Sequence, residues 1–343
     1  MLNQKRIKNN NIIIQDIVRH LMNDFYFGKI ISSDAFIRLK DISFLGAIDH
    51  SETQYILSKE KRTRYEHSLY VAALAFYISK KRKYKEDNIK NIVAAALLHD
   101  IGHLPLSHSA EPSIKKKFGI GHHELGEKII CGEIKSIKNI NMVLERYFDT
   151  NYILYLLNTR NKNKDDGSDL FSSKINIDTI DGIIRCLEYK NLNSINSLNR
   201  INIAESSFIY DEEPNIGVLD NFWKTKDFVY KNMINNNFGI IPDKISEFYF
   251  IEHEIKEEML FSCETKWKRK FKELFFRLRN NEVKDGLINK EIKITARDYF
   301  IKQKERNILE RYLNTKKTET RMAISNNIIK NEQLDLFKTG GAK

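Results

Sequence analysis

The sequence predicts an all-α fold with only minor β structure. Apolar residues recur at positions i, i+3 and i+4 along almost the whole chain, which is the spacing of one helix face. Only 4 prolines and 14 glycines occur among 343 residues, which argues against an all-β sandwich. Hydrophobic residues make up 41% of the chain, enough to bury a core in one large domain or two smaller ones.

The individual elements follow from the same spacing. It predicts helices, in chain order, over residues 35–45, 68–78, 89–98, 124–130 and 220–233. Gly102 and Pro105 are predicted to end the helix that carries residues 89–98, and the polar run 161–168 is predicted to be a loop. Two segments, 53–57 and 207–210, are candidates for short β-hairpins beside the helical body.

Composition excludes several classes of protein. No apolar run reaches the ~18–20 residues of a membrane span, and the first residues lack the apolar stretch of a secretory signal. The three cysteines, Cys131, Cys186 and Cys263, form no CxxC pair, which excludes a disulfide scaffold and a zinc ribbon. These features predict a cytoplasmic protein with no membrane contact.

Basic residues are concentrated near the C-terminus. Residues 261–343 hold 21 Lys and Arg against 11 Asp and Glu, whereas residues 1–260 hold 36 against 35. This excess fits a surface that faces a polyanion such as nucleic acid. It fits equally well a lysine-rich helical face exposed to solvent.

The histidines are clustered in the first half of the chain. Six of the nine lie between residues 67 and 123, namely His67, His99, His103, His108, His122 and His123. Histidine is the commonest metal ligand and exchanges protons near neutral pH, so the cluster indicates a metal or acid–base site.

The surrounding residues supply carboxylates for a metal ion. Asp100 follows His99 directly, and Asp178 and Asp181 lie in apolar sequence, where an unpaired charge is costly. Either one of these two aspartates is a ligand or both pair with Arg185. Two imidazoles and two carboxylates suit Mn, Fe, Zn or Mg, with positions left for water and phosphate.

Ordered motifs around these residues resemble a known family. They are RYEHSL at 64–69, HDIGHLPLSHSAE at 99–111 and HE at 123–124, with FIRL at 36–39, LG at 45–46 and FWKTK at 222–226. The set resembles the HD-domain phosphohydrolases, and within them the dNTP triphosphohydrolase branch of bacterial dGTPases and SAM-and-HD-domain enzymes. The resemblance covers roughly residues 29–235. It implies a helical HD-domain bundle for residues 1–260 and a nucleotide substrate.

The resemblance also implies a role for individual residues. The positions of metal ligands fall on His67, His99, Asp100 and Asp178. The catalytic positions fall on His103, His108, Glu111 and His123, where Glu111 would orient His108 and His123 would protonate the leaving oxygen. Phosphate-binding positions fall on Arg64 and Lys226, with lysine in place of the family's usual arginine. His122 and His50 are interpreted as structural, and Asp181 as a partner of ligands or helices.

Two departures from the family pattern concern the sugar. Phe44 stands where the family has a glutamine that contacts deoxyribose, and Gly182 stands where it has a tyrosine that packs under the sugar. The predicted activity is therefore metal-dependent hydrolysis of a nucleoside triphosphate to nucleoside and triphosphate, with the sugar and base open. The alternatives are an HD-type nuclease or phosphodiesterase acting on DNA or RNA, and a sliding-clamp or nucleic-acid-binding accessory protein. As in the family, a homo-oligomer is expected.

The last residues contain a second motif. Residues 261–313 are predicted to be a basic helical region and residues 314–343 a flexible tail. This tail carries Gln333, Leu334, Asp335, Leu336 and Phe337, which resemble the pentapeptide that docks bacterial replication proteins on the sliding clamp. The alternative is a short amphipathic turn that packs back onto the enzyme.

Overall fold

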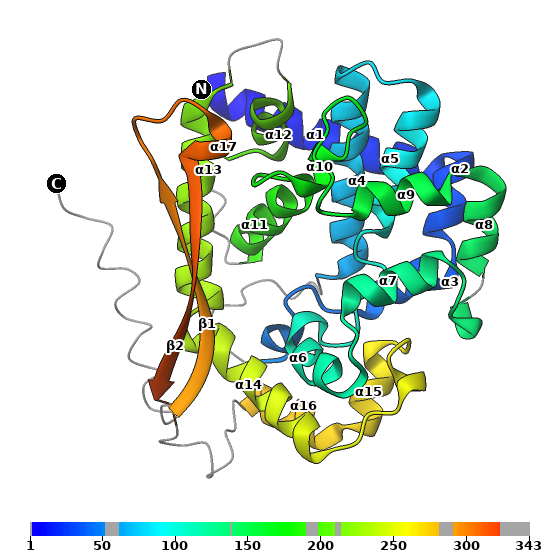
Figure 1. The fold of residues 1–343 in the computed structure, drawn as a ribbon, viewed down its shortest axis with the longest axis vertical. Coiled ribbons are helices and arrows are strands. Elements are labelled where there is room, and N and C mark those ends of the chain that lie inside the picture. The colour runs from blue at the N-terminus through cyan, green and yellow to red at the C-terminus, as the bar shows by residue number, and fades with distance from the viewer. Residues whose placement is uncertain are drawn as a thin grey trace.

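The structure is a computed structural model that describes residues 2–51, 62–137, 139–189, 198–209, 214–280 and 291–322. Helices form almost all of the described chain, and a single two-stranded sheet lies along one side of them (Figure 1). The all-α prediction with minor β structure is confirmed. None of the described helices combines the length and the apolar run that a membrane span requires.

The elements follow one another along the chain with short connections. The α-helices are α1 Leu2–Asn23, α2 Phe25–Ile31, α3 Asp34–Ile37, α4 Arg64–Lys81, α5 Glu86–Leu98, α6 Ser107–Phe118, α7 His122–Ile130, α8 Asn139–Tyr147, α9 Thr150–Leu157, α10 Asp169–Ser172, α11 Ile177–Tyr189, α12 Arg200–Phe208, α13 Ile216–Val229, α14 Asn237–Glu252, α15 Glu264–Lys270, α16 Lys272–Asn280 and α17 Ile308–Arg311. The strands are β1 Glu291–Ile301 and β2 Tyr312–Met322. Tighter 3-10 turns occupy Arg38–Asp41, Gly46–His50, Lys135–Ile137 and Glu257–Met259, and a π turn Tyr230–Ile234 extends α13.

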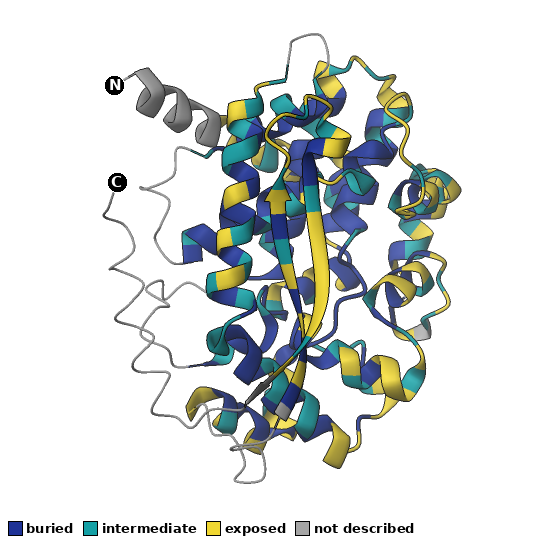
Figure 2. Cartoon of the chain, turned by 60° about the vertical axis from the view of Figure 1, so that its left-hand side comes forward, coloured by how far each residue is buried: buried dark blue, intermediate teal, exposed yellow. Residues whose placement is uncertain are grey.

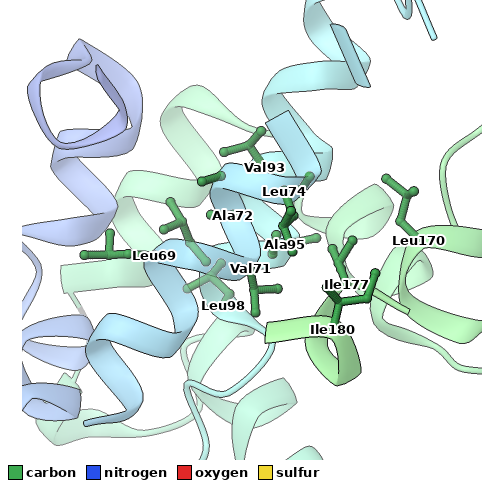
Figure 3. Close-up of a cluster of buried hydrophobic side chains, with 14 of the residues drawn as sticks. Leu69, Val71, Ala72, Leu74, Val93, Ala95, Leu98, Leu170, Ile177 and Ile180 are labelled. Atoms are coloured by element: carbon green, nitrogen blue, oxygen red, sulfur yellow. The ribbon is translucent and has the colours of Figure 1, made fainter. Parts of the chain in front are cut away.

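Helix α4 is the centre of the main core. It is buried on several sides because α1, α5, α11 and α12 all pack against it. Leu69 and Leu74 of α4, Val93 of α5, and Ile177 and Ile180 of α11 belong to one buried apolar cluster (Figure 3). The alanine-rich stretches of α4 and α5 are fully buried, and their small side chains let the two backbones approach closely.

A second apolar cluster lies below the main core. Helices α6, α14, α15 and α16 form it around Trp267, which is fully buried. Glu264 at the start of α15 is also fully buried and accepts hydrogen bonds from the backbone and hydroxyl of Ser43. The C-terminal helices are thereby fixed to the loop that precedes α4.

Most predicted helices are confirmed, and one β candidate is wrong. Residues 68–78, 89–98 and 124–130 lie in α4, α5 and α7, and 220–233 lies in α13 and its π turn. The segment 35–45 is helical only to Asp41. Residues 207–208 end α12 instead of forming a hairpin, because Ser207 and Phe208 are the last buried positions of its amphipathic face. The other candidate, 53–57, lies outside the described residues.

The prediction of a helical region over 261–313 is wrong for its second half. It holds for α15 and α16, but β1 and β2 pair antiparallel from Glu291 opposite Met322 to Ile301 opposite Tyr312. The strand signal is the alternation in residues 291–297, where Ile292, Ile294 and Ala296 are buried between polar neighbours. Residues 314–322, predicted as flexible tail, belong to β2. The clamp-like segment 333–337 lies outside the described residues.

Candidate metal centre and substrate pocket

The first predicted ligands are positioned by two helix ends. Helix α4 begins at Arg64, and its first turn is closed by Glu66, which accepts a hydrogen bond from the backbone N–H of Thr63. His67 follows in this first turn and is fully buried. His99 lies just past the end of α5, with Nδ1 2.8 Å from the carbonyl oxygen of Ala96. A proton on Nδ1 would be donated to that carbonyl, which leaves Nε2 free to accept.

The structure brings all four predicted ligands together. Nε2 of His67 lies 3.0 Å from Oδ1 of Asp178, 3.3 Å from Nε2 of His99 and 3.6 Å from Oδ2 of Asp100. Nε2 of His99 lies 3.6 Å from Oδ1 of Asp100 and 3.9 Å from Oδ1 of Asp178. The four side chains come from α4, the end of α5 and the first turn of α11. Ligand atoms of His67, His99 and Asp178 all lie within 4.8 Å of one another, and Asp100 lies beside both imidazoles.

Asp181 supports this cluster from behind. It is fully buried, and Oδ2 lies 2.6 Å from Nδ1 of His67. Its carboxylate also accepts hydrogen bonds from Arg185 and Arg200. The hydrogen bond to Nδ1 fixes the His67 ring with Nε2 facing the other three ligands, the arrangement that orients a metal-bound histidine.

The electrostatics of the four groups suit a divalent cation. Burial alone would raise the pKa of Asp178, but the hydrogen bond to His67 and the charges of His67 and His99 lower it to about 2. The pKa of Asp100 is held well below its usual range, because the charges of His99 and Arg64 outweigh burial. Two ionised carboxylates therefore face two imidazole Nε2 atoms that lie 3.3 Å apart. A cation would satisfy all four, and the mixed N/O set fits Mn, Fe, Zn or Mg.

Three further histidines form a second cluster beside the first. Ring nitrogens of His103, His108 and His122 lie within 4.8 Å of one another, and the His103 and His122 rings stack with centroids 4.2 Å apart. Glu111 joins two of them, with Oε2 3.1 Å from Nδ1 of His108 and Oε1 2.7 Å from Nδ1 of His122. The predicted pairing of His108 with Glu111 is thus present in the structure. We name His103, His108, His122 and Glu111 the imidazole cluster.

The close approach of α7 depends on the HDIGH loop. A Cβ on Gly102 would lie only 2.0 Å from the carbonyl oxygen of His122, so any larger residue would push α7 away. Arg38, from the FIRL motif, donates hydrogen bonds of 2.7 Å to the carbonyls of His103 and Ile101. These contacts hold the loop so that His103 lies between the two clusters, with Nε2 3.2 Å from Oδ1 of Asp100.

The structure differs from the sequence interpretation at the two adjacent histidines. His122, interpreted as structural, is part of the imidazole cluster, whereas His123 is exposed and contacts the ring of His122 at a centroid distance of 4.0 Å. Both residues belong to the first turn of α7, so the sequence shows two neighbours and not which one faces inward. His50 is hydrogen-bonded to Glu264, in keeping with its structural interpretation.

Desolvation by the surrounding residues favours the neutral forms of His103, His108 and His123 at neutral pH. It lowers the pKa of His108 despite the hydrogen bond to Glu111, and it lowers the pKa of His123, with a further contribution from the charge of His122. The pKa of His103 falls well below its usual range through burial and the charge of Arg64. Nε2 of His103 contacts Oδ1 of Asp100 at 3.2 Å outside hydrogen-bond geometry, and Nδ1 makes no hydrogen bond within the described residues. Neutral imidazoles can accept protons or face a phosphate oxygen without a prior charge.

A pocket of about 260 Å³ opens beside the metal ligands. Its polar lining residues include Asp178, His108, Arg64 and Lys226. Arg64 donates hydrogen bonds to Asp100 at 2.8 Å, to the carbonyl of Phe44 at 2.9 Å and to the hydroxyl of Ser107 at 3.2 Å, which leaves one N–H on each terminal nitrogen for a ligand. Burial lowers the pKa of Lys226 to about 8, partly offset by the charge of Asp178. Both predicted phosphate-binding residues therefore border the space next to the metal centre.

The two departures from the family pattern are neighbours in this pocket. The ring of Phe44 lies 4.9 Å from the ring of His67 and 4.9 Å from the guanidinium carbon of Arg64. A Cβ on Gly182 would be 3.8 Å from the tip of the Phe44 ring. The ring of Phe44 thus enters the pocket and lies against Gly182, the position on α11 that lacks a side chain.

The sequence did not identify the rest of the pocket lining. This includes Cys186 of α11, Tyr230 of the π turn, and Ser109 and Asp243. The Asp243 carboxylate accepts a hydrogen bond of 2.5 Å from Ser109, and burial raises its pKa to about 6. Asp243 is 134 residues from Ser109, and no motif joins these positions in the sequence. The only sequence feature that marks Asp243 is that it is a charged residue within an apolar stretch.

Comparison with known proteins agrees with this geometry. A family profile described as the HD domain matches residues 64–165, which include three of the four metal-site residues and the whole imidazole cluster. The similarity to the HD domain thus includes most of the site. The predicted resemblance to HD-domain phosphohydrolases is therefore confirmed.

Several curated relatives extend the HD-domain likeness along the chain. An uncharacterized MG461 homolog of Mycoplasma pneumoniae is 25% identical over 252 residues, covering 67% of this chain and 56% of that protein. A deoxyguanosinetriphosphate triphosphohydrolase-like protein of Caldanaerobacter subterraneus is 34% identical over 122 residues, covering 34% of this chain and 32% of the relative. A Dictyostelium discoideum protein named deoxynucleoside triphosphate triphosphohydrolase SAMHD1 homolog is 29% identical over 141 residues, covering 39% and 25%. The chain spans little more than half the length of the Mycoplasma relative.

A solved structure shares the fold across nearly the full chain. A hypothetical protein from Aquifex aeolicus superposes with a TM-score of 0.64 over 89% of this chain and 94% of its own, at 16% sequence identity. The arrangement of the HD-domain helices and the elements around them is thus one already seen in a crystal structure.

Proposed function

We propose that this HD-domain protein hydrolyses a nucleoside triphosphate to nucleoside and triphosphate. The observation that carries the proposal is the convergence of His67, His99, Asp100 and Asp178 beside a pocket lined by Arg64 and Lys226. Two relatives are named for this reaction on deoxynucleotides, which adds support. The four converging side chains would hold a divalent ion, which would neutralise charge that develops on the phosphoryl oxygens.

The protein's own residues would position and polarise the substrate. Arg64 and Lys226 would bind phosphate oxygens, since both present cationic nitrogens to the same pocket. His103, whose buried ring nitrogens lack hydrogen-bond partners among the described residues, would donate to an oxygen of the α-phosphate. Each of these contacts strengthens as negative charge builds on the phosphate oxygens, and so favours the transition state.

Proton transfer falls to the imidazole cluster and to His123 beside it. His108 would take a proton from the attacking water, with Glu111 fixing the tautomer through Nδ1. Water adds to the α-phosphorus, the bond from phosphorus to the 5′-oxygen breaks, and that oxygen takes a proton. His123 is the proposed donor of this proton. The negative charge of a bound triphosphate would raise the pKa of His123 and favour its protonated form.

The sugar end of the pocket supports a broad choice of pentose. The Phe44 ring occupies the region opposite Gly182 and offers stacking without a hydrogen bond. Discrimination of a hydroxyl by a factor of 10⁴ or more requires a polar partner that would otherwise be left unpaired. We therefore propose that ribo- and deoxyribonucleotides are accepted more equally than in relatives with the glutamine and tyrosine.

A second candidate function is cleavage of a nucleic acid strand at the same site. The observation that favours it is the basic β-hairpin, whose β1 packs on α13, the helix that carries Lys226. The chemistry would be the same attack on a phosphorus atom, with a strand in place of a triphosphate. An accessory role without catalysis is disfavoured by the intact set of four ligand side chains.

One experiment separates these functions. The protein is incubated with Mn²⁺ and, in turn, each dNTP, each NTP, the monophosphates, and single- and double-stranded DNA. We expect release of triphosphate from a nucleotide by the wild type, loss of that release in Asp178→Ala, and full activity in Asp165→Ala, an exposed loop control. Strand cleavage without nucleotide turnover would favour the second function. Turnover by Asp178→Ala equal to wild type would refute both.

A further inference from the structure

The middle of the β-hairpin presents one face that is polar and exposed. Three cross-strand pairs make up this face, namely Lys293 with Thr320, Thr295 with Thr318 and Arg297 with Lys316. We name these six residues the ribbon face. Figure 2 shows exposed residues running along the hairpin, which lies across the near side of the molecule. The face combines three basic side chains with three hydroxyls and holds no acidic or apolar residue.

The charges of the ribbon face are not balanced by neighbours. None of Lys293, Arg297 and Lys316 forms an ion pair with an acidic side chain within the described residues. Arg297 and Lys316 stand directly opposite each other, and like charges in that position destabilise a hairpin. An anionic ligand would convert this repulsion into attraction, so the arrangement is better suited to a bound state than to a free one.

The other side of the hairpin makes it a fixed platform. Ile292 and Ile294 are buried against Ile240 of α14. Asn235 donates a hydrogen bond of 3.0 Å to the carbonyl of Arg297, and the indole of Trp223 donates one of 3.0 Å to the carbonyl of Phe300. Because the backbone is held at several points, binding would cost little ordering of the ribbon.

The hairpin twists as it approaches the pocket. Residues 292, 294 and 296 are buried at one end, whereas Tyr299 is buried and Phe300 is 46% exposed at the other end. The Tyr299 ring contacts the ring of Tyr230, which lines the pocket, at a centroid distance of 4.8 Å, and lies 4.9 Å from the amine of Lys226. Phe300 belongs to the face opposite the ribbon face, and the twist turns that face outward beyond Arg297.

We propose that the ribbon face binds single-stranded nucleic acid through its phosphates. Lysine, arginine and threonine are the side chains that contact phosphate oxygens, and Phe300 offers a ring on which an unpaired base can stack. Lys293 and Arg297 are about 14 Å apart along the strand, so they can contact phosphates of different nucleotides. The lack of an apolar residue on the face opposes a protein or membrane partner. This binding goes beyond the hydrolysis of nucleotides and does not depend on it.

Lysines on an exposed strand have a second use, because they discourage pairing with another chain's strand. The two roles predict different results. A protective role requires only that charges stand on the strand edge, and gives no binding of nucleic acid. A phosphate-binding role predicts affinity that falls with salt in proportion to the number of contacts.

The test measures binding by fluorescence anisotropy with a 20-nucleotide oligo(dT) labelled at its 5′ end, without added divalent ions. Three phosphate contacts predict a slope of about −2 in the logarithm of affinity against salt, or about a 20-fold loss between 50 and 200 mM. The double variant Lys293→Gln with Lys316→Gln keeps one contact and should lose only about threefold over the same range. Gel analysis after each titration shows whether the strand remains intact.

A matched double variant controls for total charge. Lys85 and Lys162 are exposed in other parts of the molecule, so Lys85→Gln with Lys162→Gln removes the same charge and should bind like the wild type. Binding that does not respond to salt, equal loss in both double variants, or tighter binding of a duplex would overturn the proposal. The outcome is separate from hydrolysis, since Asp178→Ala should bind the strand like the wild type.

Discussion

The two groups of histidines in the HD domain lie side by side, yet their carboxylates are arranged differently. His67 and His99 face two aspartates, Asp178 and Asp100, which are not hydrogen-bonded to each other. His108 and His122 share the single carboxylate of Glu111, one oxygen to each ring. The first arrangement places two negative charges beside His67 and His99. In the second, the single negative charge of Glu111 orients two imidazole rings.

This difference explains why neighbouring imidazoles take opposite pKa shifts. Burial lowers the pKa of His67, but hydrogen bonds to Asp178 and Asp181 outweigh it and raise the pKa. In the imidazole cluster burial dominates, and the pKa of His103 and of His108 falls. A site that attracts positive charge thus adjoins one that stays neutral, which suits cation binding in the first and proton transfer in the second.

The largest expected effect comes from removing one carboxylate of the metal centre. Asp178→Asn should lose bound metal and lower kcat by about 10³-fold or more, because several kcal/mol of charge stabilisation would go with the ion. Metal content by mass spectrometry and nucleotide turnover would be measured together. Asp178 has a side chain that is 54% exposed, so the fold should keep its melting temperature.

Asp181→Asn is the informative comparison for that variant. Asp181 is fully buried between Arg185 and Arg200, and removal of a buried ionic partner costs about 3–5 kcal/mol. It should therefore unfold at a much lower temperature than Asp178→Asn. If the two variants lost metal and stability to the same degree, the distinction between ligand and support would be wrong.

The second expected effect concerns the imidazole cluster. Glu111→Gln should lower kcat by about 10²-fold while leaving metal content unchanged, because an amide has only one oxygen and can no longer accept an N–H hydrogen bond from both rings. Steady-state kinetics and metal analysis would be compared with Glu127→Gln, an exposed position on α7. If Glu111→Gln also lost bound metal, the imidazole cluster would contribute to metal binding, and the two clusters would not have separate roles.

The sequence predicted the first cluster more completely than the second. Each predicted metal ligand lies in a motif, such as the HD dipeptide, that matches one position of the family pattern. The orientation of α7 depends on Gly102 and on contacts with distant residues such as Arg38, so His122 and His123 could not be told apart. For the same reason, the pocket residues Asp243 and Tyr230 had no signal, since only the packing of α14 and the π turn brings them to the site.

The C-terminal region shows the same limit at the level of secondary structure. The net basic charge of residues 261–343 indicated a distinct region of the chain. Charge alone has no periodicity, so it does not distinguish an exposed helix face from a strand. The alternation in residues 291–297 was the available signal, and it is a short run beside longer helical patterns. The pairing partner lies in residues 312–322, beyond the turn and α17, and a pattern of single residues does not reveal it.

A third prediction concerns Lys226, which lines the pocket beside the metal ligands. The pKa of Lys226 is about 8 because of burial, so its charge is present below that pH and is lost as the pH rises through it. Affinity for a triphosphate should fall about tenfold between pH 7 and pH 9, measured as kcat/KM. Lys226→Arg keeps its charge over this range and should give a flat profile. An identical fall in both proteins would assign the titration to another group.

The smallest expected effect comes from Asp243, a carboxylate that accepts its hydrogen bond from the neutral hydroxyl of Ser109. Its pKa is about 6 in the folded chain, above its usual 3.8, so the folded state binds more protons between these values. Stability is therefore lost as the pH rises from about 4 to about 6, and the ionised carboxylate is a cost at neutral pH. Asp243→Asn keeps an oxygen for Ser109 and should stabilise the protein by about 1–2 kcal/mol at pH 7.5.

Thermal unfolding at two pH values tests this, because the gain should shrink at pH 5.0, where the wild-type carboxyl is mostly protonated. Equal gains at both pH values would assign the effect to packing instead of charge. The same variant should bind nucleotide more weakly if the carboxylate accepts a hydrogen bond from the base. Asp243 would then combine a stability cost with a binding role, as expected of a charge kept in a pocket without a protein partner. If Asp243→Asn were more stable but bound nucleotide with unchanged affinity, the only role of Asp243 would be to link α14 to Ser109 of α6.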